Sequence, residues 1–74
     1  MSWWLVIMFW NPAVSDYVVV NGWAPLEMGI YTVCDAGRDM AKLYVPDYTP
    51  APKVGCAYAD SSENAVKQYR EYGL

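Results

Sequence analysis

Residues 3–10 read WWLVIMFW, an uninterrupted apolar run near the start of the chain. Trp, Val, Ile and Phe dominate it, and these residue types favour β-strands. Asn11-Pro12 ends the run after a usual strand length. Successive side chains of a strand point to opposite faces, and both alternating sets of this run are apolar. The run is therefore predicted to be the central strand of a sheet, covered on both sides.

A targeting or membrane segment is the competing interpretation of this run. A secretory signal begins with a basic region, yet no Lys or Arg precedes Arg38. Pro12, Ala13 and Ser15 nevertheless imitate a cleavage region, so a signal peptide stays open as an alternative. A membrane-spanning helix needs about 20 apolar residues, and the run stops at Asn11, so no membrane span is expected.

The rest of the chain divides into short elements separated by Asn, Gly and Pro. A second β-branched run follows a short loop, which predicts an antiparallel hairpin. A late strand carries small side chains on one face, and the final helix has an N-terminal cap signature. The predicted elements are a strand at 16–23, an irregular connection at 26–31, a helix from Thr32 to Tyr44 or Val45, a Pro-rich connector at 45–52, a strand at 53–60, and a helix capped at 60–63 that ends near Tyr72.

The first predicted helix has an amphipathic pattern. Thr32, followed three positions later by Asp35, is close to the capping-box pattern. Apolar or small residues recur at helical spacing on one stripe, and charged residues occupy the opposite side. The side expected to face the core consists of Val33, Gly37, Met40 and Tyr44, with Ala36, Ala41 and Leu43 beside it, and the charged side consists of Arg38, Asp39 and Lys42.

These elements predict one α+β domain over residues 1–74, in the order ββαβα. A three-stranded antiparallel sheet of order 2-1-3 places residues 3–10 in the middle. The two helices are expected on one face, which leaves the other face open as a contact surface for another protein or a second copy. The candidate contact residues are Trp3, Trp4, Trp10, Trp23, Gly55, Ala57 and Ala59, and which tryptophan row of the first strand is exposed stays open.

Cys34 and Cys56 are the only cysteines. If the first helix packs across the last strand, their Cα atoms are expected within about 7 Å, which is close enough for a disulfide. Such a bond would stabilise the fold by roughly 3 kcal/mol. Cytosolic proteins usually keep their thiols reduced, so two small buried thiols in one core are an equally open alternative.

Composition narrows the classes of function. The chain carries eight acids, five bases and no His, for a net charge of −3. Binding to nucleic acid relies on a basic patch, so no nucleic-acid partner is expected. Two cysteines with scattered carboxylates are a poor zinc site, and no phosphate loop or activated nucleophile is evident. We therefore expect no enzymatic activity, no metal and no cofactor.

Four segments, SWWLVIMFW, YVVV, TVCDAG and VGCAYA, follow the order strand, strand, helix with a cysteine, and late strand with a cysteine. In this layout the chain resembles many short, uncharacterised phage and prophage proteins. The resemblance implies a virus-encoded accessory protein that binds, and in the leading interpretation inhibits, a host protein. The alternative is a structural virion component, such as a capsid-decorating or assembly subunit. Both imply the host cytoplasm or the virion rather than secretion.

Overall fold

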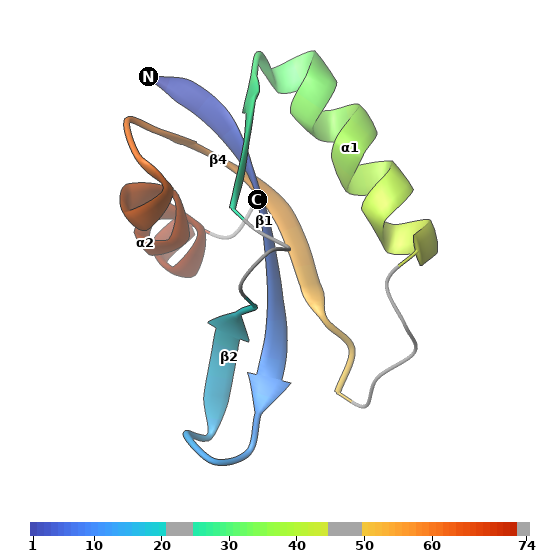
Figure 1. Cartoon of the computed structure of the whole chain (residues 1–74), viewed down its shortest axis with the longest axis vertical. Coiled ribbons are helices and arrows are strands. Elements are labelled where there is room, and N and C mark those ends of the chain that lie inside the picture. Colours follow the sequence, from blue (N-terminus) through green and yellow to red (C-terminus); the bar gives the residue numbers. More distant parts are fainter. Residues whose placement is uncertain (21–24, 45–49, 73–74) are drawn as a thin grey trace.

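A computed structural model describes residues 1–20, 25–44 and 50–72 of the chain (Figure 1). Within these ranges the strands and helices confirm the predicted α+β class. In chain order they are β1 (Ser2–Asn11), β2 (Asp16–Val19), β3 (Leu26–Gly29), α1 (Tyr31–Tyr44), β4 (Lys53–Ala59) and α2 (Ser62–Tyr72).

β1 is the central strand of an antiparallel sheet. Residues 2–8 of β1 pair with β4 along one edge. Along the other edge, residues 3–5 pair with β3 and residues 8–11 pair with β2, so β2 and β3 follow each other along the same side of β1. The predicted order, with the opening run between its hairpin partner and the late strand, is confirmed. The described residues form four strands in this sheet and not the predicted three, because β3 also pairs with β1.

β3 is a strand where the sequence predicts an irregular connection. Its residues, LEMG, lack the alternation that marks a half-buried strand, and all but Met28 are exposed. The register of its pairing with β1 shifts between Trp3 and Trp4. Gly29 then adopts a φ of 82°, a conformation that favours glycine, and the chain turns there from β3 into α1.

The two helices cover opposite faces of the sheet, so the prediction that both lie on one face is wrong (Figure 1). α1 packs over Leu5 and Ile7, whereas α2 packs over Val6 and Met8. The small side chain of Ala57 on β4 belongs to the α2 side and permits a close approach by that helix. Each apolar row of β1 is therefore covered by a different helix, which explains why both faces of this strand are apolar.

The core consists of two hydrophobic clusters, one on each side of β1. Trp4 is half-buried and packs against the cluster on the α2 side, and its indole N–H donates to the carbonyl of Ala59 at 3.0 Å. The buried residues on the α1 side are Leu5, Ile7, Cys34 and Cys56, and those on the α2 side are Val6, Met8, Ala57, Ala59 and Ala65.

The helix starts follow the predicted signals at α2 but not at α1. The hydroxyl of Ser61 accepts the backbone N–H of Asn64 at 3.2 Å, so the predicted cap of α2 is confirmed. α1 begins at Tyr31, which places Thr32 inside the helix. The capping-box prediction for Thr32 is therefore wrong, because the turn at Gly29 starts the helix earlier.

The C-terminal part of α2 is fastened to β2 by a charged contact. Arg70 donates from Nη1 to the carboxylate of Asp16 at 2.9 Å and from Nη2 to the carbonyl of Tyr17 at 2.6 Å. The backbone N–H of Tyr17 also donates to Asp16, at 2.7 Å. This N–H first, and then Arg70, hold the pKa of Asp16 below its ordinary value of 3.8.

Acid is expected to loosen this contact. Because the pKa of Asp16 is lower in the folded chain, the contact stabilises the fold fully above about pH 4 and is lost as the pH falls through the lowered value. Asp16→Asn is expected to lower the free energy of unfolding near neutral pH and to match the wild type in strong acid, where the carboxylate of Asp16 is protonated. Urea unfolding across this range measures the difference, and a deficit that persists in strong acid would contradict the prediction.

Enlarging Ala57 tests the placement of α2. Ala57 is 4% exposed beneath this helix, so Ala57→Leu is expected to lower the free energy of unfolding by about 1–3 kcal/mol. Ala36→Leu is the matched control, because Ala36 is exposed on α1, and it is expected to change stability by less than about 0.5 kcal/mol. Urea denaturation measures both variants, and equal effects would mean that α2 does not cover Ala57.

Candidate protein-contact surface

Cys34 of α1 and Cys56 of β4 are joined by a disulfide. Their Cα atoms lie 6.2 Å apart, within the separation predicted from the packing of the helix across this strand. Both residues are buried in the core on the α1 side. The bond holds α1 on the sheet and requires the side of the helix that carries Cys34 to face inward.

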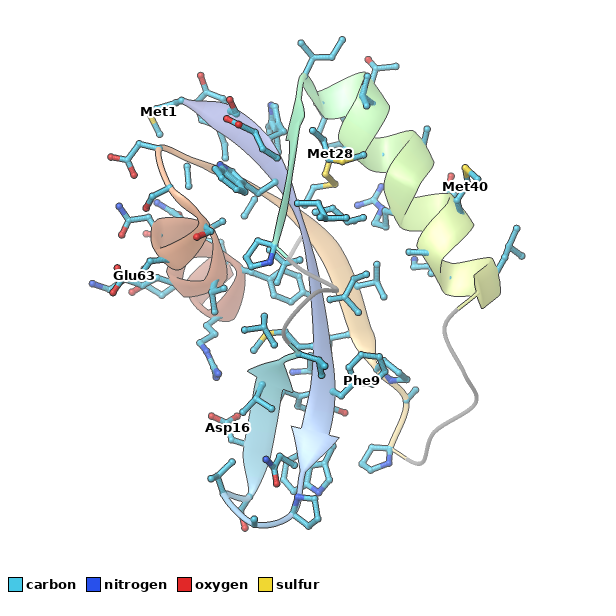
Figure 2. The ribbon with its side chains drawn as sticks, in the orientation of Figure 1. Met1, Phe9, Asp16, Met28, Met40 and Glu63 are labelled. Carbon is cyan, nitrogen blue, oxygen red and sulfur yellow. A yellow bond between two sulfur atoms is a disulfide. The ribbon has the colours of Figure 1, made fainter. Side chains whose placement is uncertain are left out.

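The side of α1 that faces the sheet is built from small residues. Cys34, Gly37 and Ala41 follow one another at spacings of three and four, so they share one side of the helix. Figure 2 shows Met28 on the sheet side of α1, beside the disulfide. A Cβ on Gly37 would lie 2.8 Å from Cε of Met28, the end of a flexible side chain, so Gly37 and Met28 face each other closely across this contact. The helix therefore lies close to the sheet but brings few large apolar side chains into the core.

The opposite side of α1 presents an apolar stripe to solvent. At ~100° per residue, Val33, Ala36, Met40 and Leu43 line up on the side of the helix away from Cys34. All four are exposed, with Met40 at 58% and Leu43 at 81%. Figure 2 shows Met40 pointing away from the sheet. We call these four residues the α1 stripe.

The α1 stripe corrects the predicted core-facing side of this helix. The sequence pattern places Val33, Gly37 and Met40 together toward the core, yet only Gly37 lies on the sheet side. The side chain of Tyr44, the fourth predicted member, lies outside the described residues. Sequence reasoning missed the stripe because it gave the large apolar residues the inward side. The available signal was Cys34, since a cysteine that reaches the neighbouring strand fixes which side of the helix faces inward.

Charged residues occupy the part of α1 that lies between the α1 stripe and the side facing the sheet. The side chain of Arg38 is 19% exposed, pairs with Asp35 and donates to the hydroxyl of Tyr31 at 3.5 Å. Asp39 is exposed and lies next to Met40 along the chain. Lys42 is also exposed and lies next to Leu43, but at ~100° per residue it is ~100° around the helix from Leu43, whereas Asp39 is only ~40° away. The charge nearest the α1 stripe is therefore the carboxylate of Asp39.

An aromatic cluster forms a second exposed apolar area at the N-terminal end of α1. The ring centroid of Trp3 lies 4.8 Å from that of Tyr31 and 5.3 Å from that of Tyr58. Both tyrosines are exposed, and so is Ile30. Trp3 belongs to the row of β1 that α1 covers, so the cluster lies at the edge of that contact.

The contact surface predicted from the sequence is not formed as a single face. Its three small residues are buried, and two of them, Ala57 and Ala59, lie in the cluster beneath α2, where small side chains allow the helix to approach. Its tryptophans have different environments. Gly55, Ala57 and Ala59 are buried, Trp3 and Trp4 are half-buried, Trp10 is exposed, and Trp23 lies outside the described residues.

The chain has no match among protein-family models, curated proteins or solved structures. In the ranges that the structure describes, no helix is long and apolar enough to cross a membrane. Within the same ranges, no three side chains of His, Cys, Asp or Glu gather where a metal ion could bind. The α1 stripe is therefore interpreted from its own geometry.

Removal of the disulfide is expected to destabilise α1 more than α2. The double variant Cys34→Ala/Cys56→Ala should lose roughly 3 kcal/mol of unfolding free energy, because the bond joins residues 22 positions apart. The amide hydrogens of α1 are expected to exchange faster by a larger factor than those of α2, since α1 has few other large contacts. Hydrogen exchange on both proteins measures this, and equal acceleration in the two helices would contradict the prediction.

Proposed function

We propose that this chain is a non-enzymatic protein-binding module whose contact surface is the α1 stripe. The proposal rests on the exposure of Met40 and Leu43 on a helix whose other side is bonded to the sheet. Leaving such a side chain in water forgoes about 1.5–3 kcal/mol relative to full burial. A fixed helix with apolar residues at spacings of three and four is the geometry of helix–helix contacts between proteins.

The size of the α1 stripe favours a partner larger than a second α1. From the exposed fractions of its side chains, the stripe offers on the order of 350 Å² of apolar surface, similar to the largest patch on a typical monomer. Stable interfaces bury about 800 Å² on each partner. Two α1 helices alone fall short of this area, whereas a larger partner contacts the surrounding surface as well.

Charge also disfavours a second copy on the α1 stripe. In an antiparallel pair of α1 helices related by a two-fold axis, the same flank of each helix meets its counterpart. If Val33 packs against Leu43 of the second copy, Asp39 lies within one helical turn of the second copy's Asp39, and the two carboxylates repel. The occupant is therefore a different protein.

The charge near the α1 stripe specifies the partner further. Asp39 is exposed beside the stripe, and the whole chain has a net charge of −3. Opposite charges across an interface raise the association rate and exclude wrong partners. The expected partner segment is an amphipathic helix with Lys or Arg beside its apolar residues.

Polar substitution of the α1 stripe tests this function. Met40→Gln/Leu43→Gln keeps helix-forming residues and is expected to weaken partner binding at least about tenfold, because central anchors carry most of the binding energy. Val14→Gln/Val20→Gln is the matched control, since both valines are exposed apolar residues outside α1. Quantitative capture from a host lysate and from purified virus particles measures each variant and separates a host protein from a virion partner.

A photo-crosslinking residue in place of Ala36 identifies what covers the α1 stripe. Mass spectrometry of the cross-linked peptide is expected to show an amphipathic helical segment with a basic flank. A cross-link to α1 of a second copy would show that the protein forms a homodimer through the stripe, and it would contradict the proposal that a different protein binds there. Equal capture by the stripe variant and the valine control would overturn the proposal.

A further inference from the structure

A hollow lies on the other face of the sheet, where β2 meets the C-terminal part of α2. Its volume is about 490 Å³, and its lining comes from β1, β2, β4 and α2. The α1 stripe contributes nothing to it, so the hollow is independent of the proposed contact surface. The lining residues are Met8, Asp16, Tyr17, Lys53, Tyr69 and Arg70.

Apolar and aromatic groups give the hollow a fixed surface. Met8 is buried in the core on this face of β1. The ring of Tyr17 packs edge-on against Trp10, with centroids 5.5 Å apart. The hydroxyl of Tyr17 donates to the carbonyl of Ala51 at 3.0 Å. The tyrosine is thus held at its ring and at its hydroxyl, which suits it to support a planar or apolar ligand.

The hollow is positively charged although the chain as a whole is acidic. Lys53 and Arg70, two of the five bases of the chain, line it together with the single acid Asp16. Asp16 is bound by Arg70 and by the N–H of Tyr17, so its charge is matched within the fold. Nζ of Lys53 lies 4.6 Å from the ring centroid of Tyr17 and has no hydrogen-bond acceptor among the described residues. The ammonium of Lys53 lies over this ring and near Asp16, but it is the one cation of the hollow that has no ion-pair partner among the described residues.

Further hydrogen-bond donors lie beside this charge. The contacts with Asp16 and the carbonyl of Tyr17 hold the guanidinium of Arg70 in place and leave other N–H groups for a ligand. Tyr69 is half-buried, and in the part of the chain that the structure describes its hydroxyl has no hydrogen-bond partner. Burial raises the pKa of Tyr69, so this hydroxyl stays protonated at neutral pH and donates.

We propose that the hollow binds a small organic anion whose apolar body rests on Tyr17 and whose carboxylate or phosphate group lies between Lys53 and Arg70 and accepts from Tyr69. A neutral ligand would leave Lys53 unmatched, and an inorganic ion would leave the apolar surface uncovered. The volume of the hollow lies within the ~300–1,000 Å³ typical of small-molecule sites.

Titration with simple probes tests this site. Benzoate and phenyl phosphate combine one aromatic ring with each head group, whereas benzyl alcohol lacks the charge and inorganic phosphate lacks the ring. Chemical shifts of the ¹⁵N-labelled protein are expected to move saturably with an aryl anion at Tyr17, Lys53, Arg70 and the Trp10 indole. Benzyl alcohol and inorganic phosphate are expected to bind at least about tenfold more weakly, a difference of ~1.4 kcal/mol.

Two pairs of variants locate the charge and the hydroxyl. Lys53→Gln is expected to weaken binding of the aryl anion about tenfold, whereas Lys67→Gln, with the same loss of charge elsewhere, leaves it unchanged. Tyr69→Phe is expected to weaken binding a few-fold through the lost donor, and Tyr72→Phe, on the same helix but exposed, is its control. A retained dispersed spectrum shows that each variant is folded.

The possible outcomes separate the proposal from non-specific ion binding. A preference between benzoate and phenyl phosphate assigns the head group as a carboxylate or a phosphate. Shifts that do not saturate, or equal effects of Lys53→Gln and Lys67→Gln, would show that anions collect only as counterions and would overturn the proposal. Binding of benzyl alcohol as tight as that of benzoate would also overturn it, because the charge would then play no part.

Discussion

The bond between Cys34 and Cys56 is the constraint that decides what α1 shows to solvent. One side of α1 carries Cys34, Gly37 and Ala41, and the opposite side carries the larger residues of the α1 stripe. Burying two of those large side chains would stabilise the fold by about 1.5–3 kcal/mol each. The disulfide stabilises the fold against unfolding by roughly 3 kcal/mol. Once formed, it also holds Cys34 against Cys56, so α1 cannot rotate to bury the stripe, and the covalent link selects the orientation that exposes it.

The sequence predicted the parts of the fold that depend on one strand and its local signals. The two apolar rows of residues 3–10 required a central strand with covers on both sides, and the hairpin and the Ser61 cap followed from local residue types. The side of the sheet for each helix was not predictable in this way. It depends on which row of β4 each helix contacts, and Cys56 and Ala57, adjacent in the chain, point to different helices. β3 was missed because LEMG carries no strand pattern and is held by its pairing with β1.

The contact surface was misplaced because the sequence argument put both helices on one face of the sheet. The hollow was missed because that argument did not compare the lengths of the elements. α2 has 11 residues and spans about 16 Å, whereas β1 has 10 residues and spans about 33 Å. A helix of this length covers only part of its face. The remaining end carries Trp10, Tyr17 and Lys53, and this is where the hollow forms. Local patterns identified these residues as strand residues. Their contact with Arg70, which pairs with Asp16 across 54 positions of sequence, depends on the tertiary fold and could not be predicted from local patterns.

The dependence of the α1 stripe on a disulfide connects the proposed contact with the redox state of the surroundings. Both cysteines are buried, at 0% and 1% exposure, so a reductant reaches the bond only when α1 opens. A chain that folds where thiols stay reduced never acquires the bond. In such a chain nothing covalent would oppose a rotation of α1 that buries Met40, and the contact surface would be lost with it. A partner that recognises the stripe is therefore expected to meet this protein where the bond has formed.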